Sequence, residues 1–581
     1  MDVSIEVGGD AGQGVESAGT GLSLALARGG LHVFGMADYR SRIRGGRNFY
    51  QVRASDRPVR CHSDPVHLVA AFTQDAAHAH VENIAPGGGV VYDEQLPVDE
   101  TALIRKGIRP MPMPLNRVAE EAGSKATLNV AAVGAALGVV GYPLHHFERV
   151  IFEKFGRRGE HVVDINLKAA RASHDHASSK YGPDFPFRLH EITGAASRML
   201  INGNQALALG AVAGGCRFIS AYPMTPATTI LEWTAARAGE LGIVTVHAED
   251  EIAAVCMAAG ASFAGARAMT ATSGGGFCLM TEAIGMAAMT EVPIVVVDVQ
   301  RGGPSTGLPT RTEQADLLLA IHPSHGDFPH IVLAPGTVEE CFEAGWRSFN
   351  LAEEYQCPVV VLSDAYLGGS LRTVGPAAFD WDSVVRDRGS FLPPEILDSR
   401  EDYQRFAWED SGVSPRAAIG HPRTVHAPST DEHDEAGHIT EDVGVRRRMM
   451  EKRMRKMDTA LRDMRGPTLY GPADAELTLV CWGSVAGPAC EAAVTLSARG
   501  TPTNVLHFSD VWPLSPDLPD EVTGSDARFV AVEQNYSGQF AGVFEGTTGL
   551  ELDGAVLKYD GRQVSPRDIV EELEREVMQV V

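Results

Sequence analysis

At 581 residues, the chain is too long for a single hydrophobic core and is expected to hold about three domains. Its composition is 44% apolar and 22% charged, as in ordinary globular proteins, and no apolar run of about 18 residues predicts a membrane-spanning helix. The formal charge of −25 argues against nucleic-acid binding, which depends on clustered Lys and Arg, and favours solubility or a salty cytoplasm. Asp2 and Glu6 make the start of the chain unlike a secretory signal, so we expect a cytoplasmic protein.

The cysteine pattern does not predict an iron–sulfur cluster on this chain. Iron–sulfur clusters are usually held by four Cys thiolates at close, recognisable spacings. The eight cysteines of this chain contain no CxxC pair and no tight group, which is more typical of small buried apolar residues. They are Cys61, Cys216, Cys256, Cys278, Cys341, Cys357, Cys481 and Cys490. Any electron-accepting cluster is therefore expected on another chain.

The first segment opens with a strand over Val3–Val7, a glycine-rich loop over residues 8–14 and an Ala/Leu-rich helix to about Arg28. In this arrangement, backbone N–H groups and the helix N-terminus can face an anion, so Gly12 and Gly14 are candidate phosphate-binding residues. The spacing is not GxGxxG, and a tight strand-to-helix turn explains the glycines equally well.

An arginine-rich run follows, which is unusual in so acidic a chain. Guanidinium groups bind phosphates through forked hydrogen bonds, so Arg44 and Arg47 are candidates for contacting a phosphate-rich ligand or an acidic partner. A solvated basic face is the alternative. The run comprises Arg40, Arg42, Arg44, Arg47 and Arg53. An α/β domain ending near residue 188 is completed by strands over 48–54, 67–72 and 89–93 and helices over 128–140 and 145–155.

The second segment begins with a strand over Arg217–Tyr222 and continues into a helix over Thr229–Leu241. Between them, Thr225 followed by Pro226 is a good helix start, with Thr as the N-cap and Pro in the first helical position. The alternative interpretation is a binding site for a ligand. A hydroxyl and free N–H groups at a helix N-terminus, beside the carboxyl end of a strand, can bind a substrate carboxylate.

A second strand, over Ile243–Ala248, leads into three acids at positions 249–251 and a helix that begins near Ile252. Acidic residues stabilise a helix N-terminus, so capping explains them. A carboxylate that engages a heterocyclic nitrogen would instead point inward.

A third strand, over Ala266–Ser273, is followed by Gly274–Gly276, a helix over Phe277–Thr290 and an apolar strand over Pro293–Val299. Consecutive glycines between a strand and a helix permit close approach of a ligand or of neighbouring backbone. Nearly continuous apolar strands are typical of a parallel sheet, whose ligands bind at the carboxyl ends of the strands. Arg301 lies in a glycine-rich loop at such an end, so we interpret it as a binding residue.

The third segment, 375–466, is irregular in pattern. Its His- and acid-rich run over 431–438 matches no zinc or EF-hand spacing, so no metal site is expected on this chain. A basic stretch over Arg446–Arg455 is interpreted as an exposed or interface helix. The last segment alternates strands and helices again, and residues 483–484 and 533–535 are expected in turns at strand ends.

Several motifs, in this order along the chain, resemble one family. Residues 8–14 read GGDAGQG, residues 222–226 read YPMTP where the family signature is YPITP, and residues 301–317 read RGGPSTGLPTRTEQADL. The C-terminal part adds CWGSVAG and VEQNYSGQF. Together they resemble the 2-oxoacid:ferredoxin oxidoreductases, in particular a gamma-type domain fused to the alpha chain of 2-oxoglutarate-type members.

The resemblance implies an α/β fold with four parts. It predicts a gamma-type oxidoreductase domain over 1–188 and a doubly wound domain of the thiamine-diphosphate, pyrimidine-binding type over 195–374. A linker with an interface helix follows over 375–466. A domain like the C-terminal domain of transketolase is predicted over 467–581.

The same resemblance implies roles for single residues. Glu251 is implied to be the catalytic residue that hydrogen-bonds N1′ of the aminopyrimidine of thiamine diphosphate, with Gly275 also at the cofactor. Thr225, Arg301 and Tyr222 are implied to bind the carboxylate or carbonyl of the substrate. The carbanion chemistry itself belongs to the cofactor.

The substrate is expected to be a 2-oxoacid. A second cation or hydrogen-bond donor near Arg301 would suit a dicarboxylate, and Arg311 or the hydroxyls of Ser305 and Thr306 are the candidates. The implied reaction is the coenzyme A-dependent oxidative decarboxylation of 2-oxoglutarate to succinyl-CoA with reduction of ferredoxin. Pyruvate and branched-chain 2-oxoacids are the alternative substrates, and the physiological direction stays open.

A beta subunit is implied by a motif that this sequence lacks. The family binds the cofactor's diphosphate and its Mg²⁺ through a GDG motif followed by Asn, which does not occur here. The resemblance therefore implies thiamine diphosphate shared with a beta subunit that holds Mg²⁺ and a [4Fe–4S] cluster, an (alpha-beta)2 assembly, and ferredoxin as partner. Coenzyme A is the implied co-substrate, and Gly12, Gly14, Arg44 and Arg47 are predicted to receive its phosphates.

Two other functions compete with this interpretation. A non-oxidative thiamine enzyme, such as a decarboxylase or a transketolase relative, would need the GDG motif within this chain. A non-catalytic nucleotide-binding scaffold rests on the first glycine loop alone, and it leaves Glu251 and Arg301 unexplained.

Overall fold

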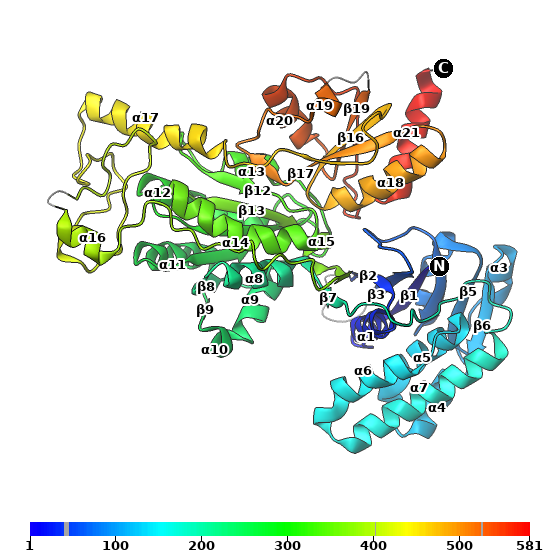
Figure 1. The fold of residues 1–581 in the computed structure, drawn as a ribbon. Coiled ribbons are helices and arrows are strands. Elements are labelled where there is room, and N and C mark those ends of the chain that lie inside the picture. Colours follow the sequence, from blue (N-terminus) through cyan, green and yellow to red (C-terminus); the bar gives the residue numbers. More distant parts are fainter. Residues whose placement is uncertain (40–45, 401–402, 524–526, 581) are drawn as a thin grey trace. The chain divides into compact units, whose positions relative to one another are not determined.

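The computed structural model describes residues 1–39, 46–400, 403–523 and 527–580. These residues form two compact units, whose elements are labelled in Figure 1. Unit 1 contains Met1–Asn202, Gly369–Ala378 and Ser565–Arg567, and unit 2 contains Gly203–Gly368, Phe379–Val564 and the residues from Asp568 on. The predicted α/β class is confirmed, whereas the four-part division stays a prediction. No helix of the described ranges is long and apolar enough to cross a bilayer.

Unit 1 is built on a mixed eight-stranded sheet in the order β6-β5-β4-β1-β3-β2-β14-β7. Its first strand, β1 (Asp2–Asp10), pairs in parallel with β4 (Val66–Ala71) and antiparallel with β3 (Arg47–Ser55). These strands confirm predictions from the sequence, whereas β2 is not among the predictions. The other strands are β2 (His32–Asp38), β5 (Ile84–Asp93), β6 (Arg109–Met113), β7 (Met199–Ile201) and β14 (Leu371–Val374).

Helix α5 (Leu128–Val140) is buried over most of its length and packs along α7 (Glu160–Lys180). Gly134 and Gly138 make this close approach possible, because a Cβ on either would lie 2.5 Å from a backbone oxygen of α7. The predicted bounds of α5 and α6 (His145–Phe155) are confirmed. The other helices are α1 (Val15–Arg28), α2 (Gln74–Ala79), α3 (Glu100–Arg105) and α4 (Leu115–Ala122), with 3-10 turns at Val81–Asn83, Lys125–Thr127 and Gly156–Arg158.

Unit 2 contains two sheets, of which the first has seven strands in the order β18-β12-β13-β11-β10-β8-β9. All its neighbouring strands are parallel except β18. The central strands β10, β11 and β13 are buried along their whole length, as expected for parallel strands covered on both faces. The strands are β8 (Phe218–Ala221), β9 (Val244–His247), β10 (Ala268–Thr272), β11 (Val295–Gln300), β12 (Ile331–Leu333), β13 (Val359–Asp364) and β18 (Asp510–Trp512).

The helices connected to this sheet correct two predictions. The helix predicted over 229–241 is two helices, α9 (Thr228–Ala235) and α10 (Ala238–Leu241). The three consecutive glycines are not a loop, because they form the first turn of α12 (Gly274–Met289) immediately after β10. The remaining helices are α8 (Gly203–Ala213), α11 (Glu251–Phe263), α13 (Leu317–Ile321), α14 (Val338–Tyr355) and α15 (Ala365–Gly369).

The second sheet of unit 2 has five strands in the order β15-β17-β16-β19-β20, and only β15 is antiparallel to its neighbour. Its strands are β15 (Thr468–Tyr470), β16 (Leu477–Trp482), β17 (Thr503–Phe508), β19 (Arg528–Glu533) and β20 (Gly554–Leu557). The helices are α18 (Ala486–Ala498), α19 (Asp520–Thr523), α20 (Gln539–Thr548) and α21 (Pro566–Val580), with a 3-10 turn at Gly483–Val485.

Residues 379–466, which lie between β14 and β15 along the chain, are mostly irregular, as predicted. It contains α16 (Pro394–Ser399), a 3-10 turn at Pro422–Thr424 and α17 (Val443–Ala460). The basic stretch is helical, as predicted, and Arg446–Arg448 are exposed, but Lys452, Arg453 and Lys456 are buried, so one face of the helix packs against the protein. Buried cations require ionic partners, since an unpaired charge inside a protein is costly.

A candidate active site at the carboxyl ends of β8, β10 and β11

Three parallel strands of unit 2 end beside one another. In the sheet, β10 lies between β8 and β11, and the carboxyl ends of the three strands lead into Tyr222, Ser273 and Arg301. Ligands of open parallel sheets bind at this edge, because loops and helix N-termini converge there. The prediction that a parallel sheet brings these segments to one edge is confirmed.

Arg301 and Thr225 are in direct contact. Arg301 Nη1 donates a hydrogen bond of 2.6 Å to the backbone carbonyl of Thr225. The prediction that Thr225 caps a helix is wrong, because α9 begins at Thr228 with Ala227 as its N-cap residue. Tyr222, which is 39% exposed, precedes Thr225 on the connection between β8 and α9. A guanidinium, a hydroxyl and a phenol at one sheet edge suit a carboxylate-containing ligand.

Asp250 and Glu251, at the start of α11, have different surroundings. Asp250 is the N-cap residue, and its Oδ1 accepts a hydrogen bond of 2.7 Å from the backbone N–H of Ala253. Glu251, the first residue of the helix, is only 4% exposed, and its Oε1 has no hydrogen-bond partner among the described residues. Because buried polar atoms are almost always paired, this orphan oxygen marks a place where a ligand can donate a hydrogen bond.

The first turn of α12 leaves room for Glu251. A Cβ on Gly276 would lie 2.8 Å from Glu251 Oε1 and 2.1 Å from Thr272 Oγ1, so a side chain there would displace the carboxylate. A Cβ on Gly275 would meet only the carbonyl oxygen of Ser305, at 3.9 Å, so this position faces open space. The sequence reasoning selected Gly275, and a run of three glycines gives no signal that separates it from Gly276.

A buried carboxyl pair, which the sequence reasoning missed, lies near Arg301. Asp298 in β11 has no exposed surface, and neither carboxyl oxygen has a hydrogen-bond donor within the described ranges. Burial and Asp316 raise the pKa of Asp298 well above its usual range, while burial and Glu313 raise the pKa of Asp316 to about 6. Arg301 acts on both in the opposite direction. Both carboxyls therefore keep their protons to higher pH than an exposed aspartate does.

We expect Asp298→Asn to raise stability at neutral pH. A carboxyl whose pKa is raised in the folded state stabilises the protein at low pH, and this contribution is lost as the pH rises through the raised pKa. The pKa of Asp298 is raised well above its usual range, and that of its partner Asp316 is about 6. Asparagine stays neutral and can donate to Asp316, so the free energy of unfolding should rise by about 1 kcal/mol or more at pH 7.5 and by less at pH 5.5. Urea unfolding at both pH values measures this difference.

Asp364→Leu serves as the control for that experiment. Asp364 is equally buried, but its Oδ1 accepts hydrogen bonds from the Leu367 backbone N–H at 2.9 Å and from Thr312 Oγ1 at 3.3 Å. Leucine has a similar volume but cannot accept either hydrogen bond, so this variant should lower the free energy of unfolding. If Asp298→Asn lowered the free energy of unfolding to the same extent at pH 7.5, the account of the raised pKa of Asp298 would be wrong.

The loop that follows β11, residues 301–311, closes on itself. The backbone N–H of Leu308 donates a 2.7 Å hydrogen bond to the carbonyl of Gly302, which brings the two arms of the loop together. Ser305 and Thr306 are exposed at its tip. No contact in the described structure joins their hydroxyls to Arg301, so their role in substrate binding stays a prediction.

Comparisons with known proteins identify the family. Residues 209–452 match the family model described as pyruvate flavodoxin/ferredoxin oxidoreductase, thiamine diP-bdg, and residues 4–175 match the one described as pyruvate ferredoxin/flavodoxin oxidoreductase. The chain is 32% identical to the alpha subunit of 2-oxoacid:ferredoxin oxidoreductase 2 from Aeropyrum pernix, over 97% of this chain and 96% of that relative. The chain belongs to the 2-oxoacid:ferredoxin oxidoreductase alpha subunits.

Other members of this oxidoreductase family agree with that assignment. The chain is 31% identical to the 2-oxoglutarate oxidoreductase subunit KorA of Mycobacterium tuberculosis, over 94% of this chain and 87% of that subunit. A solved 2-oxoglutarate:ferredoxin oxidoreductase from Magnetococcus marinus, with 2-oxoglutarate, coenzyme A and succinyl-CoA bound, matches with a TM-score of 0.91 and 34% identity over 99% of both chains. The family resemblance seen in the motifs is thus confirmed, and an alpha subunit implies a partner subunit.

In this alpha subunit, the second sheet of unit 2 holds the segment after the 301–311 loop. The backbone N–H of Gln314 donates to the carbonyl of Gln534 at 2.8 Å, and its Nε2 donates to the carbonyl of Trp482 at 3.1 Å. Asn535 Nδ2 donates to the carbonyl of Gln314 at 3.1 Å. A Cβ on Gly561 would lie 3.1 Å from Cβ of Arg311, the last residue of the loop. Gln534 and Asn535, which the sequence predicted only as turn residues, therefore also hold the segment that follows the 301–311 loop.

The glycine loop of unit 1 lies between β1 and α1, as predicted. Gly12 and Gly14 have φ values of +92° and +77°, which favour glycine. Arg47 opens β3 and lies 3.8 Å from Asp75 in an exposed ion pair. Arg44 lies outside the described residues. Phosphate binding by this oxidoreductase domain stays a prediction.

Unit 1 also holds one group with the composition of a metal site. Nitrogens of His145 and His146 and a carboxylate oxygen of Glu191 lie within 4.8 Å of one another. The sequence gives no motif for it, since Glu191 is far from the two histidines along the chain. The 2.9 Å contact between His146 Nε2 and Glu191 Oε2 is explained by a hydrogen bond without a metal.

Proposed function

We propose that this chain is the alpha subunit of a 2-oxoglutarate:ferredoxin oxidoreductase. In that reaction, 2-oxoglutarate, coenzyme A and two oxidised ferredoxins give succinyl-CoA, carbon dioxide, two reduced ferredoxins and a proton, and the reverse reaction uses the same site. One observation carries the proposal: the unpartnered buried oxygen of Glu251, at the start of α11, lies at the same sheet edge as the Arg301–Thr225 contact.

Glu251 and the glycines of α12 fit the aminopyrimidine ring of thiamine diphosphate. A protonated ring N1′ would supply the donor that Glu251 Oε1 lacks, Gly276 makes room for the Glu251 carboxylate, and Gly275 leaves open space for a ring. When bound, the cofactor supplies the electron sink for decarboxylation. The proposed part of Glu251 is to hold a proton at N1′ and to orient the ring.

Arg301 and Thr225 are proposed to bind the carboxylate that all 2-oxoacids share. A guanidinium fixed by a hydrogen bond to backbone is oriented before the substrate arrives, which lowers the cost of binding. The second carboxylate of 2-oxoglutarate needs further donors, and the 301–311 loop offers a guanidinium and two hydroxyls. The proposed substrate-binding set is Tyr222, Thr225, Arg301, Ser305, Thr306 and Arg311.

The proposal includes a beta subunit that binds the diphosphate and Mg²⁺, carries a [4Fe–4S] cluster and passes electrons to ferredoxin in an (alpha-beta)2 assembly. It is supported by the absence of a GDG motif from the sequence and by eight scattered cysteines, none of which forms a disulfide. Cysteines without disulfides also favour a reducing, cytoplasmic location. Gly12, Gly14, Arg44 and Arg47 are proposed to receive the phosphates of coenzyme A.

We expect Arg301→Gln to raise the KM for every 2-oxoacid about tenfold or more, because it removes a charge-assisted hydrogen bond to the shared carboxylate. Arg311→Gln is the matched variant. It should raise the KM for 2-oxoglutarate and leave the KM for pyruvate unchanged. Steady-state reduction of a viologen dye by the two-subunit enzyme measures both. An unchanged KM for 2-oxoglutarate in Arg301→Gln would place the substrate elsewhere.

A further inference from the structure

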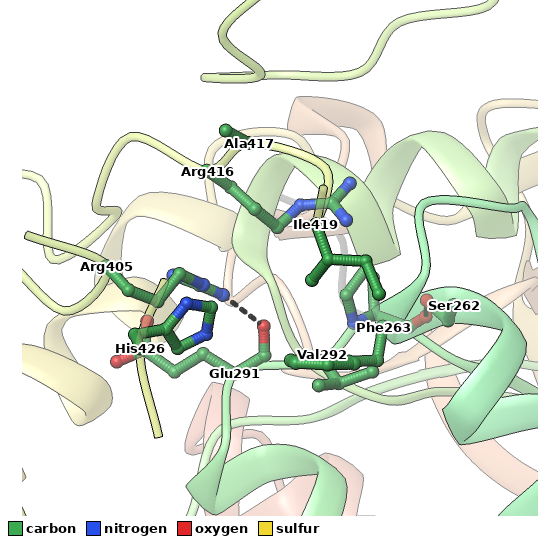
Figure 2. Close-up of a pocket in the computed structure, with 10 residues that line it drawn as sticks. Ser262, Phe263, Glu291, Val292, Arg405, Arg416, Ala417, Ile419 and His426 are labelled. Carbon is green, nitrogen blue, oxygen red and sulfur yellow. Dashed lines mark hydrogen bonds between the residues drawn. The ribbon is translucent and has the colours of Figure 1, made fainter. Parts of the chain in front are cut away.

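A small pocket lies at the opposite edge of the seven-stranded sheet from the candidate active site. Glu291 and Val292 line it and immediately precede β11, whose carboxyl end leads to Arg301. The pocket has room for roughly one water-sized sphere. The opposite wall of the pocket comes from the 379–466 segment and includes Arg405, Arg416, Ile419 and His426 (Figure 2).

Glu291 is already neutralised by other side chains. It is fully buried, and its two carboxylate oxygens accept hydrogen bonds of 2.6 Å from Lys452 Nζ and from Lys456 Nζ. Arg405 instead donates to neutral oxygens, the Glu291 carbonyl at 2.6 Å and Gln356 Oε1 at 2.8 Å. Within the described structure, the buried guanidinium of Arg405 therefore has no carboxylate partner.

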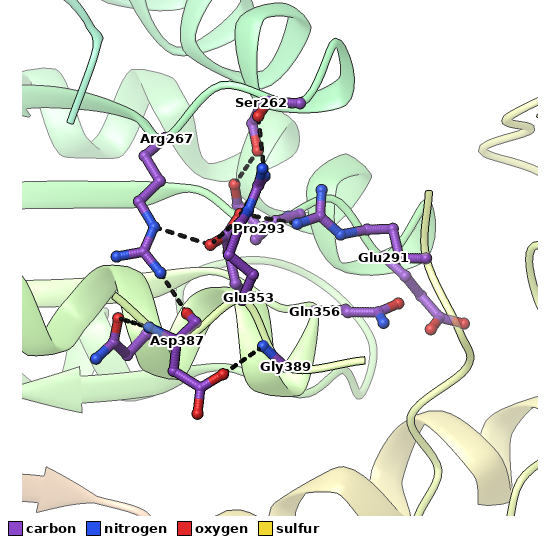
Figure 3. A network of polar contacts seen from close by, with 12 residues as sticks. Ser262, Arg267, Glu291, Pro293, Glu353, Gln356, Asp387 and Gly389 are labelled. Atoms are coloured by element: carbon purple, nitrogen blue, oxygen red, sulfur yellow. Dashed lines mark hydrogen bonds and ion pairs between the residues drawn. The ribbon is translucent and has the colours of Figure 1, made fainter. Parts of the chain in front are cut away.

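A second carboxylate, Glu353, is shared by three arginines, and Figure 3 shows part of this network. Arg267 Nε donates to Glu353 Oε2 at 2.8 Å, while Arg388 Nη2 and Arg416 Nη2 donate to Oε1 at 2.7 and 2.8 Å. Arg416 is 5% exposed, and its buried Nε has no hydrogen-bond partner among the described residues. One buried N–H donor of the pocket wall is thus unused.

The two clusters hold more cations than carboxylates. The carboxylates of Glu291 and Glu353 pair in the described part of the chain with four buried cations, Lys452, Lys456, Arg267 and Arg416, and with the partly exposed Arg388, while the buried Arg405 donates only to neutral oxygens. Burial and neighbouring cations lower the pKa of Lys452 to about 8 and that of Arg416 to about 10. Such an excess of buried positive charge is costly unless an anion compensates it. It is also unexpected in a chain with a net charge of −25.

We propose that this pocket binds a single small inorganic anion, chloride, between Arg405 and Arg416. Chloride is only slightly larger than water, so it suits the pocket, whereas phosphate and nucleotides are too large for it. Arg405 and Arg416 both line the pocket, the Nε–H of Arg416 has no hydrogen-bond partner among the described residues, and the surrounding cations provide the charge. Arg405 and Arg416 belong to the 379–466 segment, and Val292 lies just before β11 of the seven-stranded sheet. A bound chloride would therefore stabilise the packing of that segment against the sheet.

Bromide, an anomalous scatterer of similar size, is the direct probe of this site. Crystals of the two-subunit enzyme grown without halide and then soaked in sodium bromide should show an anomalous peak between Arg405 and Arg416. The absence of a peak at this position, with bromide bound elsewhere on the surface, would overturn the proposal. The experiment uses the unmodified protein, so it does not depend on any variant folding.

Thermal unfolding provides the second test. Replacing sodium gluconate by sodium chloride at constant ionic strength should raise the Tm by about 2 °C and then saturate. Arg416→Gln should abolish this rise. Arg388→Gln should retain it, because Arg388 contacts the same carboxylate oxygen of Glu353 but does not line the pocket. An equal rise in both variants, or in gluconate, would show ordinary salt screening and no site.

Discussion

Glu251→Gln is expected to lower kcat of the two-subunit enzyme about a hundredfold or more, which is the usual cost of removing a positioned acid–base group. A glutamine keeps the shape of the side chain but cannot hold and return a proton at N1′ of the aminopyrimidine. Because Glu251 is 4% exposed with an unpartnered Oε1, the variant should fold at least as stably as the natural protein. Viologen-dye reduction with saturating 2-oxoglutarate, coenzyme A and thiamine diphosphate measures kcat.

Asp250→Asn is the matched control for Glu251→Gln. It removes the same charge one position earlier, and asparagine preserves the N-cap hydrogen bond to Ala253. We expect kcat within about twofold of the natural enzyme, since this exposed side chain is engaged in capping α11 and asparagine can cap it equally well. A similar loss of activity in both variants would mean that Glu251 acts only through general electrostatics, and the proposed contact with the aminopyrimidine would be abandoned.

Glu291→Gln is expected to lower the free energy of unfolding by about 3 to 5 kcal/mol, the usual cost of removing one partner of a buried ion pair. Glu291 is fully buried, and its carboxylate is the partner of Lys452 and Lys456. An amide cannot neutralise two lysines that lie one helical turn apart on α17. The shift of the urea unfolding midpoint, followed by circular dichroism, measures the loss.

Glu343→Gln provides the comparison for an exposed pair. Glu343 pairs with Arg465, and the side chains are 29% and 47% exposed. Because water already solvates such a pair, its loss should cost less than about 1 kcal/mol. If Glu291→Gln cost no more than Glu343→Gln, the excess of buried positive charge around Glu291 would not be an energetic liability, and the case for a bound anion would lose its main support.

Local pattern was sufficient to predict much of the fold. The all-apolar stretch of α5 and the alternation of short apolar strands with helices gave correct elements in both units. The exceptions have physical causes. The 222–226 segment carries a good N-cap sequence, yet the helix begins at Thr228, because tertiary contacts such as that between Arg301 and the Thr225 carbonyl hold the chain in another conformation. The helix propensity of α17 was clear, but its burial depends on Glu291, a distant residue.

The candidate site was predictable only in part. Sheet topology brings Thr225, Glu251 and Arg301 to one edge, and that topology follows from the strand pattern. Which of the acids at 249–251 points inward depends on the helix cap, and the choice of Asp250 as the cap appears only in the structure. The Asp298–Asp316 pair was missed. An acid in the apolar strand β11 is unusual and is visible in the sequence, but its partner lies in a later segment of the chain, so local pattern does not reveal the pair.

The most direct measurement of the central claim is viologen-dye reduction by this chain, by its copurified partner subunit and by both together, with a panel of 2-oxoacids and coenzyme A. We predict activity only when both chains are present, with the highest kcat/KM for 2-oxoglutarate and formation of succinyl-CoA. A cofactor-loaded two-chain complex that reduces no dye with any 2-oxoacid would contradict the proposed function, and preference for pyruvate would overturn the assignment of the dicarboxylate substrate.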